Sequence, residues 1–121
     1  MSEDYKVKIP CGKCGDWSVE QFEVTEEQAK KERLQSLFNG SRIVPVGTYT
    51  ALKQIKCLVM SDTPDEIQDH FSIIKEAKDH VLLNGLGIGL ALRAVIEKPE
   101  VTHVTVIEKS KDVITLVGVF Y

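Results

Sequence analysis

The sequence lacks any long apolar run and any excess of positive charge. A helix that crosses a bilayer needs about 20 consecutive apolar residues, and no stretch of the 121 residues approaches that length. The opening residues, Met1 to Asp4, are acidic where a secretory signal would be basic. We therefore expect no membrane partner and a cytoplasmic protein.

Acidic residues slightly outnumber basic ones. The 15 Lys and Arg against 18 Asp and Glu give a net charge of −3, so nothing indicates a nucleic-acid partner, for which a basic surface is typical. The apolar fraction of 43% is that of a folded globular chain. We expect one α/β domain, with N-terminal strands and a helix over residues 1–60 and a βαβ portion over residues 61–121.

Cysteine is scarce, with only three residues. An odd number cannot pair completely, and thiols are usual in a reducing compartment. Cys11 and Cys14 have the two-residue spacing of half a zinc site, to which Cys57 could add a third ligand and a His the fourth. A site shared between two copies is a further alternative. Because a second pair is missing, we favour free thiols in a turn and predict no bound metal.

The N-terminal third has the alternating pattern of a β-hairpin. Strands are expected at residues 5–10 and 17–24, joined by a turn over residues 11–16. In the second segment the apolar residues fall first on odd-numbered and then on even-numbered positions. This change of parity predicts a bulge near Glu20 or Gln21.

A capping box then predicts the start of a helix. The Thr25 hydroxyl can accept from the backbone amide of Gln28, whose side chain reaches back, and Asn39-Gly40 supplies a left-handed end. Two short strands are expected next, at residues 43–49 and 54–60.

A second capping signal is present at Thr63-Pro64-Asp65-Glu66, with Pro64 at the first helical position and Glu66 at the third. Apolar residues at helical spacing follow from Ile67 to Ala77, which predicts one helix with a single buried stripe.

The final third reads as strand, glycine loop, helix and strand. These segments are Val81 to Asn84, Gly85 to Gly89, Ile88 to Lys98 and Val101 to Ile107. Parallel strands need a crossover of this length, so we predict a βαβ unit. The apolar residues 113–121 fit either a strand or a helix.

The glycine loop and an acidic residue beyond it indicate nucleotide binding. Glycines at 85, 87 and 89 permit a tight turn and close approach of a ligand, and amides at the start of the next helix favour a negative group. Glu108 ends the second strand, where a carboxylate can accept from ribose hydroxyls. The alternative is a tight turn beside a solvated strand end. The dinucleotide motif would have glycine where Leu90 stands, so the spacing favours a methyl donor over NAD.

These segments carry a resemblance to a known family. The stretch VLLNGLGIGLALRAVIEKPEVTHVTVIEKSKDVITLV, residues 81–117, resembles the first motif and following strand of class I S-adenosylmethionine-dependent methyltransferases, especially the spermidine-synthase-like branch. Residues 17–24, 28–40 and 49–70 resemble a subgroup of predicted methyltransferases common in bacteriophages. The resemblance implies a partial Rossmann-like fold, a cytoplasmic location (that of the host if the protein is phage-encoded), and S-adenosylmethionine as cofactor.

The resemblance also implies which residues form the site. The residues implied to bind the cofactor are Asn84, Gly85, Leu86, Gly87, Gly89, Glu108 and Lys109. Glu108 would hold the ribose hydroxyls, and the segment from Met60 to His70 would close over the site, with Asp62 and His70 as candidates on the substrate side. Spermidine-synthase-like enzymes use a Gln where Met60 stands, so polyamine chemistry is not implied.

Family members continue through several more strands, whereas this chain ends at Tyr121. Two central strands alone would leave apolar surface and unpaired edges exposed, which favours a homo-oligomer. The leading expectation is a truncated or remnant methyltransferase of unknown acceptor and unknown catalytic residues. The alternatives are a non-catalytic oligomeric interaction module and, less favoured, an NAD-binding protein.

Overall fold

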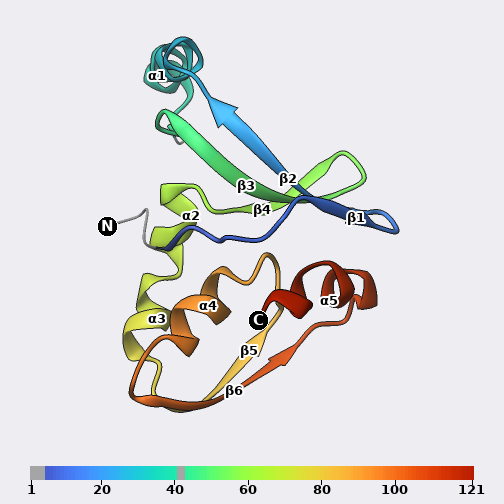
Figure 1. The fold of residues 1–121 in the computed structure, drawn as a ribbon. Coiled ribbons are helices and arrows are strands. Elements are labelled where there is room, and N and C mark those ends of the chain that lie inside the picture. The colour runs from blue at the N-terminus through green and yellow to red at the C-terminus, as the bar shows by residue number, and fades with distance from the viewer. Residues whose placement is uncertain (1–4, 41–42) are drawn as a thin grey trace.

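The computed structural model describes residues 5–40 and 43–121, which form a mixed α/β fold with two separate sheets (Figure 1). Strands β1 (Gly12–Cys14), β2 (Trp17–Val24), β3 (Gly47–Gln54) and β4 (Cys57–Ser61) form an antiparallel sheet in that order. Strands β5 (Asp79–Asn84) and β6 (Val101–Ile107) form a parallel pair. None of the described helices is long and apolar enough to cross a membrane.

The expected first strand is wrong in position. Residues 5–10 are not a strand, and β1 begins only at Gly12 within the expected turn, so that the hairpin turns at Gly15-Asp16. The physical reason lies in the backbone of the preceding segment. The Val7 amide donates 3.1 Å to the buried carboxylate of Asp62, so this part of the chain is held by a side chain instead of a strand.

The expected bulge in β2 is also wrong, because β2 pairs with β3 without interruption from Trp17 to Val24. The change of parity has another cause. Val19 faces the main core, whereas Val24 faces a small second cluster formed with Ala29 and Tyr49. One strand therefore supplies apolar residues to a different core on each face.

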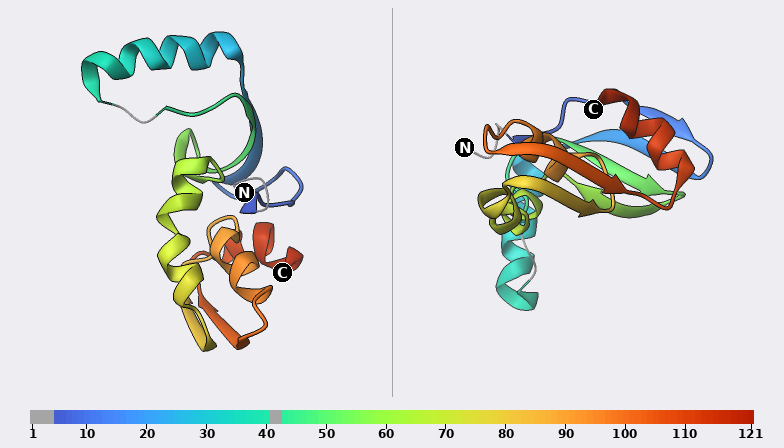
Figure 2. Two further views of the ribbon diagram at one scale, coloured as in Figure 1. Left: turned by 90° about the vertical axis from the view of Figure 1, so that its left-hand side faces the viewer. Right: turned by 90° about the horizontal axis from the view of Figure 1, so that it is seen from below.

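Helix α1 (Glu26–Asn39) confirms the predicted capping box and left-handed end. Gln28 N donates to the Thr25 hydroxyl, the Gln28 side chain accepts from Thr25 N, and Gly40 has φ +66°. The helix extends away from the rest of the molecule (Figures 1 and 2), and its only buried residue is Ala29.

Strands β3 and β4 lie later than expected. Residues 43–46 are not a strand, and β3 extends to Gln54 because both of its faces are covered: the four residues from Tyr49 to Leu52 are all buried. The turn to β4 places Ile55 at φ +58°. The irregular register of this sheet occurs between Leu52 and Lys53.

The helix expected after Thr63 is divided in two. Helix α2 (Pro64–Asp69) and helix α3 (Phe71–Glu76) meet at His70. Thr63 is the N-cap and Pro64 occupies the first turn, as expected, but the Thr63 side chain makes no capping hydrogen bond. Glu66 instead accepts from the amide and hydroxyl of Ser61 at 2.8 and 2.9 Å. The carboxylate thus ties α2 to the end of β4.

The C-terminal part confirms the predicted strand–loop–helix–strand order. β5 and β6 are parallel and in register from His80 with His103 to Asn84 with Ile107. Helix α4 (Leu90–Ile96) crosses between them and is shorter than expected. The apolar ending is helical, comprising α5 (Lys111–Val117) and a 3-10 turn at Gly118–Phe120.

One apolar core joins the two parts of the chain. It is formed by residues from the N-terminal segment, β2, β3, α2, β5, the glycine loop, α4 and α5: Val7, Ile9, Val19, Leu52, Ile67, Leu83, Leu86, Ile88, Leu90, Leu92, Val113 and Val117. This shared core fixes the position of β4 relative to the glycine loop.

Candidate cofactor-binding site

The loop between β5 and α4 has the conformation for which glycine is suited. Gly85, Gly87 and Gly89 have φ values of +99°, +55° and +80°. Side chains with a Cβ rarely adopt this left-handed region, at a cost of about 1–2 kcal/mol per residue. The alternating glycines therefore set the path of the chain from the end of β5 into α4.

Glu108 lies beside this loop, at the end of β6. Its Oε1 accepts from the Leu86 amide at 2.9 Å and its Oε2 accepts from the Ser110 amide at 3.0 Å. Burial acts to raise the pKa of Glu108, but these amides and those of Gly87 and Lys109 outweigh it and lower the pKa. The residue is therefore a carboxylate at neutral pH, held against the loop by backbone donors.

The amides of the loop itself donate to groups within the protein. The Leu86 amide donates to Glu108, the Ile88 amide donates to the Met60 thioether at 3.3 Å, and the Gly89 amide donates to Leu86 O. The Gly85 amide donates to Ile107 O. The protein's own groups take up these four donors, so a ligand at the loop would be recognised by Glu108 and not by these amides.

Two side chains from distant parts of the sequence occupy the space that the glycines leave. A Cβ at Gly87 would lie 2.1 Å from Met60 Sδ, and one at Gly89 would lie 2.2 Å from the Tyr121 ring. The Tyr121 hydroxyl donates to Ile88 O at 2.9 Å. A Cβ at Gly85, in contrast, would meet nothing within 4 Å. The open part of the loop is therefore at Gly85.

The structure places the other expected cofactor residues around the same edge. Asn84 and Lys109 are exposed, whereas Leu86 turns into the core. Leu90, at the position where a dinucleotide motif would have glycine, is 1% exposed and packs in the core. Sequence reasoning missed Tyr121, because nothing in a C-terminal tyrosine indicates contact with a loop 32 residues earlier.

Asp62 and His70, the candidates on the substrate side, both make contacts within the protein. Asp62 is 1% exposed and accepts from the Val7 and Thr50 amides at 3.1 and 2.7 Å. Burial, only partly offset by these donors, raises its pKa. His70 Nδ1 lies 2.6 Å from Glu66 O at the junction of α2 and α3.

The three cysteines are free thiols. Cys14 Sγ lies 3.4 Å from an Asp112 carboxylate oxygen, and desolvation together with this carboxylate raises the pKa of the thiol. A raised pKa disfavours the thiolate that binds zinc. Among residues 5–40 and 43–121, no three His, Cys, Asp or Glu side chains gather as metal ligands.

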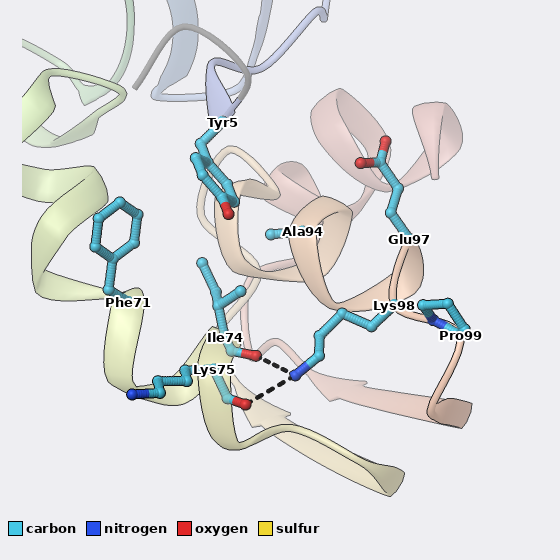
Figure 3. A pocket seen from close by; sticks show the side chains of 8 residues that line it. All are labelled: Tyr5, Phe71, Ile74, Lys75, Ala94, Glu97, Lys98 and Pro99. Carbon is cyan, nitrogen blue, oxygen red and sulfur yellow. Dashed lines mark hydrogen bonds between the residues drawn. The ribbon is translucent and has the colours of Figure 1, made fainter. Parts of the chain in front are cut away.

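A separate cleft of about 570 Å³ lies between α3 and α4, beneath Tyr5 (Figure 3). Lys98 lines one side of the cleft, where its ammonium donates to the carbonyls of Ile74 and Lys75 at the end of α3. None of the residues that line this cleft belongs to the glycine loop. It is therefore distinct from the candidate site at Glu108.

Comparisons with family models, with curated proteins and with solved structures gave no match to this chain.

Proposed function

We propose that the protein binds S-adenosylmethionine at the edge formed by Gly85 and Glu108, within a partial Rossmann-like fold. The observation that carries the proposal is the ionised Glu108 carboxylate beside the open position at Gly85. An acidic residue at the end of the second parallel strand is suited to accept from the two hydroxyls of a ribose. The order of β5, glycine loop, α4 and β6 supports the same assignment.

Methyl transfer from a sulfonium depends mainly on aligning the donor, the methyl carbon and the acceptor. The proposed contribution of this chain is to hold the cofactor, and the acceptor is not assigned. Met60 and Tyr121 lie where the cofactor would extend over Gly87 and Gly89, so binding requires at least the Met60 side chain to move aside. Methionine is flexible enough to do so without changing the backbone.

Calorimetric titration with S-adenosylmethionine and its demethylated product tests the proposal. Glu108→Gln keeps the size of the side chain but removes its charge, and we expect it to weaken binding at least tenfold, about 1.4 kcal/mol. Glu100→Gln, an exposed carboxylate at the opposite end of β6, is the matched control and should leave the affinity unchanged.

Met60→Ala should have the opposite effect on cofactor affinity from Glu108→Gln. Removing the thioether that competes for the space over Gly87 should tighten binding, since a site that is partly self-occupied binds more weakly than an open one. Absence of binding in the intact protein and in Met60→Ala together would refute the cofactor proposal.

A second candidate function, self-assembly, is favoured by a different observation. The face of the β5–β6 sheet that points away from α4 carries Leu82 and Ile107, which are 58% and 56% exposed. Within the described residues no further strand pairs with either edge. We infer that this face associates with a second copy, because open strand edges and apolar faces are usually covered.

Light scattering at increasing protein concentration tests this second candidate. Leu82→Glu should abolish association. Leu34→Glu on α1 changes a leucine of the same exposed fraction, 58%, and is the matched control. A monomer at all concentrations, or association lost only in Leu34→Glu, would count against assembly through the sheet.

A further inference from the structure

Two histidines stand side by side on the open face of the β5–β6 sheet. His80 and His103 are register partners on the two parallel strands, and both are exposed. Their ring centroids are 5.1 Å apart, with 50° between the ring planes. The two residues lie on paired strands at one end of the continuous register that runs to Asn84 and Ile107, next to a shift in register between Asp79 and His80.

This spacing is that of two imidazoles on one metal ion. Zn–N bonds are about 2.0–2.1 Å long, so the centre of a ligating ring lies about 3.2 Å from the metal, and two such rings at a tetrahedral angle are about 5.2 Å apart. The observed separation of 5.1 Å matches this distance between ring centres. Imidazole is also a preferred ligand for zinc, copper and nickel.

One chain supplies only half of a tetrahedral site. No third His, Cys, Asp or Glu of the described residues joins the pair, whereas a structural zinc site takes four protein ligands. The same pair in a second copy, related by a two-fold axis through the metal, would complete four nitrogen ligands. Sheets packed face to face lie about 10 Å apart, a gap that two opposed imidazoles and a shared ion can span.

The residues around the pair fit a second copy of this chain as the occupant. Leu82 and Thr105 are the next register pair on this face, and Asn84 and Ile107 follow. Leu82 and Ile107 are both more than half exposed, so apolar surface lies beside the histidines for the opposing sheet to cover. Viewed from below, β5 and β6 lie across the molecule with no described element over this face (Figure 2).

We propose that His80 and His103 form half of a zinc site that joins two copies of this protein through their β5–β6 sheets. The proposal deepens the inferred self-assembly by naming what holds the copies together, and it does not depend on cofactor binding. It requires one zinc ion for every two chains.

The test measures zinc content and molecular mass of the full chain in a Cys11→Ser, Cys14→Ser, Cys57→Ser background, which removes the thiols as competing ligands. After treatment with a chelator and addition of zinc, we expect half an equivalent of bound zinc per chain and a doubling of mass. His80→Asn and His103→Asn should each lose both effects, while circular dichroism stays unchanged. His70→Asn, on the helix junction, is the matched control and should retain both.

Cobalt substitution gives an independent readout. Ligation by imidazoles should give a tetrahedral cobalt spectrum without thiolate charge transfer, in the wild-type chain as in the cysteine-free one. One zinc per chain on a monomer, no zinc binding, or binding unaffected by both histidine variants would overturn the proposal. A dimer that forms equally in chelator would overturn the metal site while leaving self-assembly through the sheet in place.

Discussion

Replacing Gly89 by alanine probes how tightly Tyr121 packs on the glycine loop. A Cβ at Gly89 would lie 2.2 Å from the Tyr121 ring, and the residue has φ +80°. The left-handed conformation costs a residue with a Cβ about 1–2 kcal/mol, and an overpacked contact costs about 1–3 kcal/mol more. We therefore expect Gly89→Ala to lower the free energy of unfolding by about 2–5 kcal/mol.

Gly85→Ala separates the two contributions. Gly85 has φ +99°, but a Cβ there meets nothing within 4 Å, so only the conformational cost of about 1–2 kcal/mol should appear. In a Tyr121→Ala background the ring is gone, and the two alanine variants should then be destabilised equally. Urea denaturation followed by circular dichroism measures each free energy. Equal losses in the presence of Tyr121, or no rescue by Tyr121→Ala, would refute the reasoning.

The remaining predictions concern carboxylates and one helix cap. Asp62→Ala leaves two buried amides without an acceptor and should cost about 2–5 kcal/mol in urea denaturation, whereas Asp65→Ala on α2 should cost far less. The pKa of Asp62 is raised in the folded state, so its contribution to the free energy of unfolding falls as pH rises above about 4. Asp62→Asn should remove this part of the pH dependence of stability. The pKa of Glu108 is lowered in the folded state, so its contribution to the free energy of unfolding is present above about pH 4.3 and is lost on acidification. Glu108→Gln should therefore make the free energy of unfolding less dependent on pH at acidic pH. Thr25→Ala removes the N-cap of α1 and should lower the free energy of unfolding by about 1 kcal/mol, measured by thermal denaturation followed by circular dichroism.

Local signals in the sequence predicted the elements whose ends they define. The Thr25 box and Gly40 fixed both ends of α1 because these residues satisfy backbone groups of the helix itself. The glycine loop likewise predicted the turn between β5 and α4, and the apolar runs on either side predicted two parallel strands. These inferences needed only neighbours in the chain.

Features that depend on distant residues were not predictable in this way. The parity change in β2 was interpreted as a bulge, because the sequence does not show that Tyr49 and Ala29 form a second core on the other face. Residues 5–10 alternate like a strand, yet the Val7 amide is taken by Asp62, 55 positions later. The filling of the glycine loop by Met60 and Tyr121 belongs to the same class of long-range contacts.

The position of β4 explains why ligand access to Gly87 would be decided by the Met60 side chain. Met60 is followed by Ser61 and Asp62, both 1% exposed, and their hydrogen bonds to Glu66 and Thr50 hold this part of the backbone in place. Only the flexible Met60 side chain can leave Gly87 without breaking that buried network. A ligand over Gly87 would therefore compete with the Met60 thioether, and its association constant would be multiplied by the fraction of molecules in which Met60 leaves this space open.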